Sequence, residues 1–230
     1  MASAAARGRG FGRGRGFGIS KTETRPGENS DERKNSSSKD TAENLNLTEV
    51  LGDLKDANVD EKEATLSRYI SSSDSSGRIK KVVDVLCQRT LKDKEFAPLV
   101  GKVANKLCSD ESFGVAFRGS LLKSTQELYK NRENIRKKSV GEWFGLAALI
   151  CELFNHLRTG DAPLKVLAGA AYQTLSELLL IKGDPARYQE ELDEDEVDCF
   201  YQHFKTVGKN LEEADMVSPM AMVCTNRCTL

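Results

Sequence analysis

The first residues of the chain have side chains suited to contacts with nucleic acid. Residues 1–21 contain no acidic side chain, and glycine alternates there with arginine or phenylalanine. Arginine contacts phosphates and stacks on bases, aromatic rings offer stacking platforms, and glycine lets the backbone follow a single strand. The residues predicted to contact RNA are Arg7, Arg9, Phe11, Arg13, Arg15 and Phe17. Because this arm is short, it predicts weak, non-specific and salt-dependent binding. The alternative is a flexible tail, with or without arginine methylation, that has no dedicated ligand.

Two charged clusters are candidates for binding a protein partner. Residues 190–198 carry seven carboxylates in nine positions at the start of a predicted helix, where the helix dipole favours negative charge. A solvated helix cap is the first interpretation, and an acidic docking patch is the second. Residues 123–138 form a positive edge, which is either a solvated face or a partner site. The candidate partner surface comprises Lys123, Lys130, Arg132, Arg136, Glu194, Asp195 and Glu196.

Histidine and cysteine form no recognisable catalytic or metal-binding signature. His156 and His203 lie on different predicted helices among apolar neighbours, which favours a structural or exposed role. Cys224 and Cys228 lack the second pair of ligands that a tetrahedral zinc site needs. The other cysteines fall in apolar helical patterns typical of buried free thiols in a reducing compartment. The chain also has no dinucleotide fingerprint, phosphate-binding loop or nucleophile elbow. We therefore expect neither enzymatic activity nor a cofactor nor a metal.

Length and charge limit the chain to one domain with tails. It has 230 residues, and 34 basic side chains against 35 acidic ones leave a formal net charge of −1. Any electrostatic function must therefore be local. No stretch approaches the roughly 18 consecutive apolar residues of a membrane-spanning helix, and the N-terminus lacks the apolar segment of a signal peptide. We expect no membrane contact and a cytoplasmic location, with the nucleus as a second compartment.

Changes in composition predict three segments. Residues 1–60 are expected to form a disordered arm and a polar linker that is at most partly helical, with helical order beginning near Glu61. Residues 61–213 form the helical domain, and residues 214–230 form an irregular tail. Within the domain, apolar residues recur every three or four positions and no alternating strand pattern occurs, so the domain is predicted to be all-α.

The helical pattern predicts an α-solenoid. The predicted helices contain the apolar stripes at 79–87 and 96–108, and then span 112–134, 139–157, 163–183 and 193–211. Short breaks separate them, so pairing in order gives about three antiparallel hairpins stacked side by side. A closed six-helix bundle is the alternative. The buried stripe of the last helix is predicted to be Val197, Phe200, Tyr201, Phe204 and Val207.

A set of core positions then resembles a known family. The set is Phe117-Arg118, Leu121-Leu122, Gln126, Tyr129, Trp143, Ile150-Cys151, Phe154, Leu157-Arg158, Glu196-Val197-Asp198-Cys199 and Val207-Gly208. It resembles the middle domain of translation initiation factor 4G over about residues 78–213. The pattern is most similar to the small single-domain members, such as the stem-loop-binding-protein-interacting protein and the initiation factor that works with the nuclear cap-binding complex.

The resemblance implies HEAT-type hairpins that act as a scaffold, with no catalytic residue. Such a scaffold would join RNA-bound proteins to the initiation machinery, so its partners would be translation proteins or mRNA-end-binding proteins. The family domain has about five hairpins, so the three predicted here imply a shortened C-terminus that leaves the pattern at Met216. A missing cap would expose the apolar flank at Phe200, Phe204 and Val207. The alternative function is a general RNA-binding protein that acts through its arm, with helices that only form a homodimer.

Overall fold

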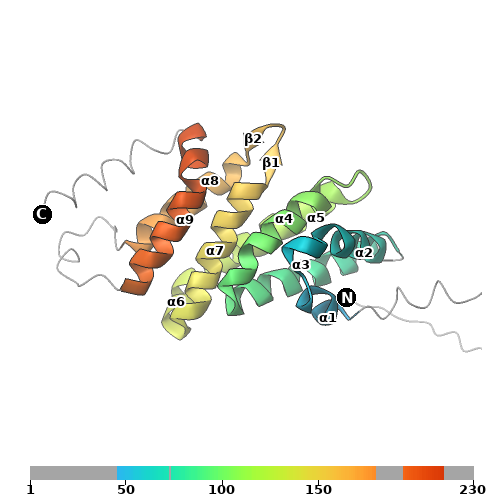
Figure 1. The fold of residues 1–230 in the computed structure, drawn as a ribbon, viewed down its shortest axis with the longest axis horizontal. Helices are drawn as coiled ribbons and strands as arrows, with labels where there is room; N and C mark the ends of the chain where they lie inside the picture. The colour runs from blue at the N-terminus through green and yellow to red at the C-terminus, as the bar shows by residue number, and fades with distance from the viewer. Residues whose placement is uncertain (1–45, 73, 180–193, 215–230) are drawn as a thin grey trace, which may run out of the picture. The chain divides into compact units, whose positions relative to one another are not determined.

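The described part of the chain consists almost entirely of helices (Figure 1). The computed structural model describes residues 46–72, 74–179 and 194–214, all within the compact unit 37–230. The α-helices are α1 (Leu47–Gly52), α2 (Val59–Ser71), α3 (Ser75–Lys92), α4 (Ala97–Cys108), α5 (Gly114–Lys130), α6 (Arg132–Lys138), α7 (Val140–His156), α8 (Lys165–Leu178) and α9 (Glu194–Glu213). Two 3-10 helices, η1 (Asp56–Asn58) and η2 (Lys94–Phe96), and an antiparallel pair of short strands, β1 (Arg158–Thr159) and β2 (Ala162–Pro163), complete it. The predicted all-α class is confirmed.

The helices pack as stacked hairpins in two layers. Helices α2, α4, α7 and α9 lie side by side in that order, and α3, α5 and α8 each follow one of them through a short connection. Figure 1 shows α7 between α4 and α9. The predicted stack of hairpins is thus confirmed, but its pairing is shifted by one helix. The sequence pattern did not predict α2 as a separate helix. In the structure α3 pairs with α2 and not with α4, α5 pairs with α4, and α8 pairs with α7.

Helix α7 is the centre of the core. All its residues from 143 to 154 are buried, which suits a helix that is apolar on every side. Two glycines permit its close packing against neighbours. A Cβ atom at Gly145 would lie 2.4 Å from the carbonyl oxygen of Thr90 on α3. A Cβ atom at Gly101 on α4 would lie 2.9 Å from the carbonyl oxygen of Glu152 on α7. Backbone therefore approaches backbone at both contacts, and any larger side chain would push the helices apart.

Helical order begins earlier than predicted. The Asn46 side chain caps α1 by accepting a hydrogen bond from the Glu49 amide, and Leu47, Leu51 and Leu54 are buried in the core. The Arg89 guanidinium on α3 donates to the carbonyl of Leu51. The linker before Glu61 is thus partly helical, as the pattern allowed, but its first helix packs into the core well before the predicted start of helical order. A helix of only six residues is too short to show an apolar period, and its partners lie on α3.

Two predicted helices have different boundaries. The helix predicted at 112–134 ends at Lys130, because Asn131 leaves the helical conformation before α6 begins. Ser139 caps α7 as predicted, since its hydroxyl accepts a hydrogen bond from the Glu142 amide. Pro163 does not open the next helix but pairs with Arg158 in the β1–β2 hairpin, whose turn contains Gly160 at a φ of 62°. Helix α8 starts two residues later.

The buried face of α9 also differs from the predicted stripe. Val197 is 37% exposed and Tyr201 59% exposed, whereas the residues buried on α9 are Glu196, Cys199, Val207, Asn210 and Leu211. Val207 therefore does not belong to an exposed apolar flank. Phe200 and Phe204 are partly buried and stack with their ring centroids 5.3 Å apart. The helix is rotated from the prediction because polar side chains at 196 and 210 find partners inside the domain.

Candidate partner-binding surface

The predicted nucleic-acid contacts lie outside the described residues. This applies to the whole set Arg7, Arg9, Phe11, Arg13, Arg15 and Phe17, and also to Cys224 and Cys228. The prediction that the arm contacts RNA therefore stays a prediction. The structure does describe every residue of the predicted partner surface. It divides them into residues that make contacts within the domain and residues that are exposed.

Within the domain, one ion pair joins α6 to α8. The Arg132 guanidinium donates from Nε to Oε2 of Glu177 at 3.1 Å and from Nη2 to Oε1 at 3.0 Å. Glu177 is only 5% exposed. The hydrogen bonds that Arg132 donates to Glu177 raise the pKa of the guanidinium above its ordinary value. Arg132 also lies 4.4 Å from the centre of the Tyr129 ring.

A second pair joins α6 to α9. The Arg136 guanidinium, one turn after Arg132, donates to the carboxylate of Glu196, which is 5% exposed. The same guanidinium lies 5.9 Å from the centre of the Trp143 ring. Three members of the predicted partner surface, Arg132, Arg136 and Glu196, therefore make contacts within the domain. Lys123, Lys130, Glu194 and Asp195 are exposed, and for them a partner role stays a prediction.

Polar side chains also gather between α7 and α9. Asn210 donates from Nδ2 to Oδ1 of Asn155 at 3.2 Å and accepts a hydrogen bond from Arg158. His156 Nε2 lies 3.4 Å from Oε2 of the buried Glu152. Burial lowers the pKa of His203, so that imidazole is neutral at pH 7. The Asn155–Asn210 bond joins α7 to α9, and the bond from Arg158 adds a second link to α9.

The described cysteines and acidic clusters show no sign of chemical reactivity. Burial raises the pKa of Cys87 and of Cys199 to about 12, and it also raises the pKa of Cys108 and Cys151. Thiols with such pKa values are protonated at pH 7 and are poor nucleophiles. Within the described ranges no group of three or more His, Cys, Asp or Glu residues could hold a metal ion. None of the helices there has the length and apolar character that crossing a membrane requires.

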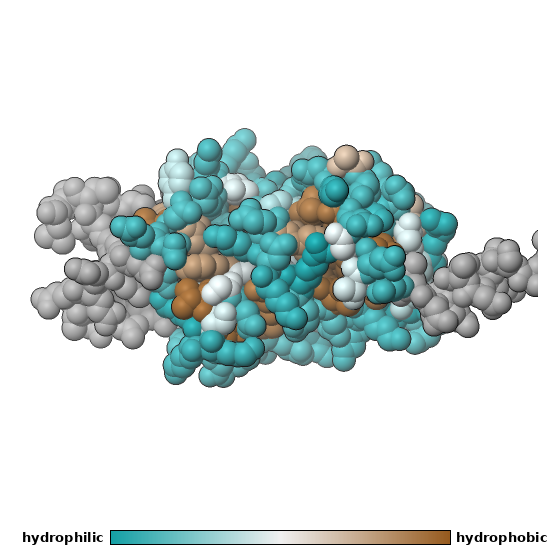
Figure 2. Space-filling view, turned by 60° about the horizontal axis from the view of Figure 1, so that its bottom comes forward, coloured by the Kyte–Doolittle hydropathy of each residue, from teal (hydrophilic) through white to brown (hydrophobic). Residues whose placement is uncertain are grey.

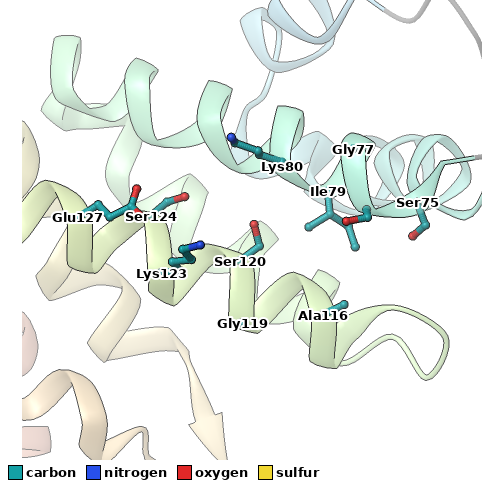
Figure 3. A pocket seen from close by; sticks show the side chains of 11 residues that line it. Ser75, Gly77, Ile79, Lys80, Ala116, Gly119, Ser120, Lys123, Ser124 and Glu127 are labelled. Carbon is teal, nitrogen blue, oxygen red and sulfur yellow. The ribbon is translucent and has the colours of Figure 1, made fainter. Parts of the chain in front are cut away.

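A hollow of about 600 Å³ lies between α3 and α5. Figure 3 shows Ile79 pointing from α3 towards α5, with Lys80 lying along α3, and it shows Ser120, Lys123, Ser124 and Glu127 on the facing side of α5. Ala116 and Gly119 on α5 contribute little side-chain volume, which leaves space there. The hollow is therefore lined by apolar atoms together with hydroxyl and charged groups.

An apolar hollow of about 510 Å³ lies on the other side of α5, facing α8. Its lining comes from three helices: Gly119, Leu122, Lys123, Thr125, Gln126 and Tyr129 on α5, Ile150 on α7, and Val166, Leu167 and Ala170 on α8. Lys123 and Gly119 line both hollows. Figure 2 shows one face of the molecule, on which hydrophilic side chains predominate and hydrophobic ones form small separate areas.

Sequence reasoning missed this apolar hollow. One indication of it is present in the sequence. Leu122 and Tyr129 lie on α5 beside the buried stripe, so the apolar surface of this helix is wider than one packed face requires. The other signal is Val166, which is 69% exposed at the start of α8. Neither signal shows that the two helices stand next to each other, because that depends on how both pack on α7.

Comparisons with known proteins agree with the predicted family. The MIF4G domain matches residues 46–224, beyond Met216, where the pattern was predicted to leave the family. MIF4G domain-containing protein B of Danio rerio is 30% identical over 141 residues, which are 60% of each chain. The CBP80/20-dependent translation initiation factor of Xenopus tropicalis is 28% identical over 171 residues, covering 73% of this chain and 28% of that protein. MIF4G domain-containing protein of the same frog is 27% identical over 169 residues, covering 72% of this chain and 73% of that protein.

Proposed function

Because the chain belongs to the MIF4G domain family, the helical middle-domain family of initiation factor 4G, we propose that it is a non-enzymatic adaptor in mRNA translation. It links RNA-bound proteins to the initiation machinery. The observation that carries this proposal is the family match over residues 46–224, which includes every described helix. One relative is named a translation initiation factor, and this supports the same process.

The helical stack suits an adaptor better than an enzyme. Stacked hairpins present long, shallow surfaces that fit peptides and helices. The described thiols are protonated and the partly buried His203 is neutral, so the described helices hold these groups without activating them. We further propose a cytoplasmic location, with the nucleus as a second compartment, and partners among translation proteins or mRNA-end-binding proteins.

The arm adds weak RNA affinity to this scaffold in our proposal. The alternative is an RNA-binding protein of ribonucleoprotein assembly, in which the arm is the functional element and the helices only form a homodimer. This alternative rests on the Arg-Gly pattern of residues 1–21 alone.

Affinity capture separates the two functions. The full chain and a chain lacking residues 1–21 are used as baits in cell lysate, with and without RNase, and captured proteins are identified by mass spectrometry. The adaptor proposal expects initiation factors or mRNA-end-binding proteins with both baits after RNase treatment. If capture requires both the arm and intact RNA, the alternative is correct.

A further inference from the structure

We propose that the apolar hollow between α5 and α8 binds a peptide segment of a protein partner, one that inserts an apolar side chain and places a carboxylate beside Lys123. This inference rests on the proposed adaptor function and names the surface and the partner chemistry for it. The apolar lining of the hollow and the charge at its rim support it independently.

The shape of the hollow suits an inserted side chain. Ile150 of α7 forms its floor, Leu122 of α5 and Leu167 of α8 contribute apolar walls, and Val166 stands at its edge with 69% of its surface exposed. A volume of about 510 Å³ lies within the range of sites that hold a small molecule or a large side chain. Apolar grooves between two helices are a recurring binding place for amphipathic segments.

The two hydroxyl groups in the lining do not face the open space. Oγ1 of Thr125 and the hydroxyl oxygen of Tyr129 are buried, with almost no accessible surface. A side chain in the hollow therefore contacts mainly apolar atoms, which favours an apolar ligand group.

Charge selects an acidic partner. Lys123 is exposed at the rim of the hollow and forms no ion pair with any described residue. The nearby Arg132 is already neutralised by Glu177, and Glu127 lines only the hollow on the α3 side. The uncompensated charge beside the apolar hollow is therefore positive, which complements a carboxylate on the bound segment.

The continuity of the surface favours a peptide over an isolated small molecule. Gly119 and Lys123 line the hollows on both sides of α5, so a chain crossing at Gly119 would pass from the apolar hollow to the hollow beside α3. The glycine has nothing within 4 Å of the position of a Cβ atom, which leaves open space above the helix at this crossing. A peptide can use both hollows at once, and its acidic residue can contact Lys123 between them.

The test uses a displayed library of random 16-residue peptides selected on the full chain. We expect enriched peptides to combine a large apolar residue with a neighbouring Asp or Glu. The strongest peptide, labelled with fluorescein, is then titrated with wild-type protein and variants and followed by fluorescence anisotropy. Enrichment of basic peptides, or no enrichment, would overturn the proposal.

Matched variants locate the binding site. Val166→Glu places a like charge at the edge of the apolar hollow and is expected to weaken binding at least tenfold. Val115→Glu makes the same change on a valine that is 88% exposed and lines neither hollow, so binding should stay unchanged. Equal losses in both variants would contradict the assignment.

The outcome can be separated from that of the adaptor proposal. If wild-type protein captures initiation factors from RNase-treated lysate and Val166→Glu captures them equally well, the adaptor function stands and the hollow is not its site. If wild-type protein captures none, the adaptor proposal itself fails. Sedimentation velocity of both valine variants tests a second copy of this chain as the occupant. A dimer that only Val166→Glu disrupts, without a change in peptide binding, would overturn the partner assignment.

Discussion

Ion pairs with the same spacing stabilise the two ends of the domain in different ways. On the N-terminal side, Lys102 and Lys106 of α4 reach Asp56 at 2.5 Å and Asp60 at 2.6 Å. On the C-terminal side, Arg132 and Arg136 of α6, also four residues apart, reach Glu177 and Glu196. The aspartate side chains are 70% and 87% exposed, whereas both glutamate side chains are 6% exposed.

This difference teaches that the C-terminal helices depend on buried polar contacts. Exposed pairs contribute little because water screens them, while a buried carboxylate that loses its partner is costly. At the N-terminal end, apolar side chains of α1, α2 and α3 carry the packing, Arg78 and Arg89 of α3 bond to backbone carbonyls and not to carboxylates, and the exposed lysine pairs add little. At the C-terminal end, the arginines of α6 hold α8 and α9 in place. Four substitutions test this comparison, and their expected effects decrease in the order given.

The first substitution attacks α7, the helix that both ends share. Gly145→Ala should lower the free energy of unfolding by about 3 kcal/mol, the upper end of overpacking costs, because the rigid α3 backbone at Thr90 lies within 2.4 Å of the new Cβ position. Urea denaturation followed by circular dichroism measures it. Gly141→Ala in the same helix is the control, since the nearest atom would lie at 3.8 Å, and it should cost nothing. Similar results for both glycines would refute the close-packing argument.

The second substitution breaks one buried pair. Arg136→Met should lower the free energy of unfolding by about 2 kcal/mol, less than for a fully buried pair because the Arg136 side chain is 28% exposed. Lys137→Met, at the exposed neighbouring position, should change it by less than about 0.5 kcal/mol. Urea denaturation again gives the values. Adding Glu196→Gln to Arg136→Met should recover part of the loss, because the buried charge is then removed. A further loss in the double variant would contradict an attractive pair.

The third test uses pH on the α7–α9 contact. Burial lowers the pKa of His203 below its ordinary value, while Glu152, Lys94 and Glu95 act on it through their charges. The unfolded chain therefore binds a proton more readily than the folded chain as the pH falls below about 6.5. Stability should decrease from pH 7 towards pH 5, and the His203→Gln variant should show a shallower decrease. Parallel pH profiles for the two proteins would exclude His203 as the cause.

The smallest effect is expected on the N-terminal side. Asp56→Asn removes the ion pair to Lys102, yet the melting temperature should stay within experimental error because both side chains are solvated. For the same reason, salt that screens the Asp56–Lys102 pair in the wild-type protein should cause no measurable loss of melting temperature through this pair. A loss as large as that of Arg136→Met would mean that the two ends of the domain are stabilised alike.

Much of the fold could be predicted from local pattern. The period of apolar residues identified the helices that became α3, α4, α7 and α9, and the Ser139 cap placed the start of α7 correctly. The pattern failed where structure depends on distant partners. Helix α1 is stable because Leu47 and Leu51 are buried in the core and Arg89 bonds to its backbone. Helix α9 is rotated because Glu196 turns inward to Arg136.

The candidate site was less predictable than the fold. Charge and spacing singled out Lys123, Arg132, Arg136 and Glu196 as one group. Only the packed structure shows that Arg132, Arg136 and Glu196 form ion pairs within the domain, whereas Lys123 borders a hollow. Residues 132 and 177 are too far apart in the chain for any local rule to pair them.

The sequence by itself determined the helical class, the approximate helix positions, the resemblance to the initiation factor 4G middle domain and the basic arm, because these depend on residue types and on short-range periodicity. Tertiary structure alone decided which helices pair, which charges are neutralised and where the apolar hollow lies. The physical reason is that burial and desolvation are set by groups distant in sequence. A charged residue on a helix looks the same in the sequence whether it faces water or a buried carboxylate.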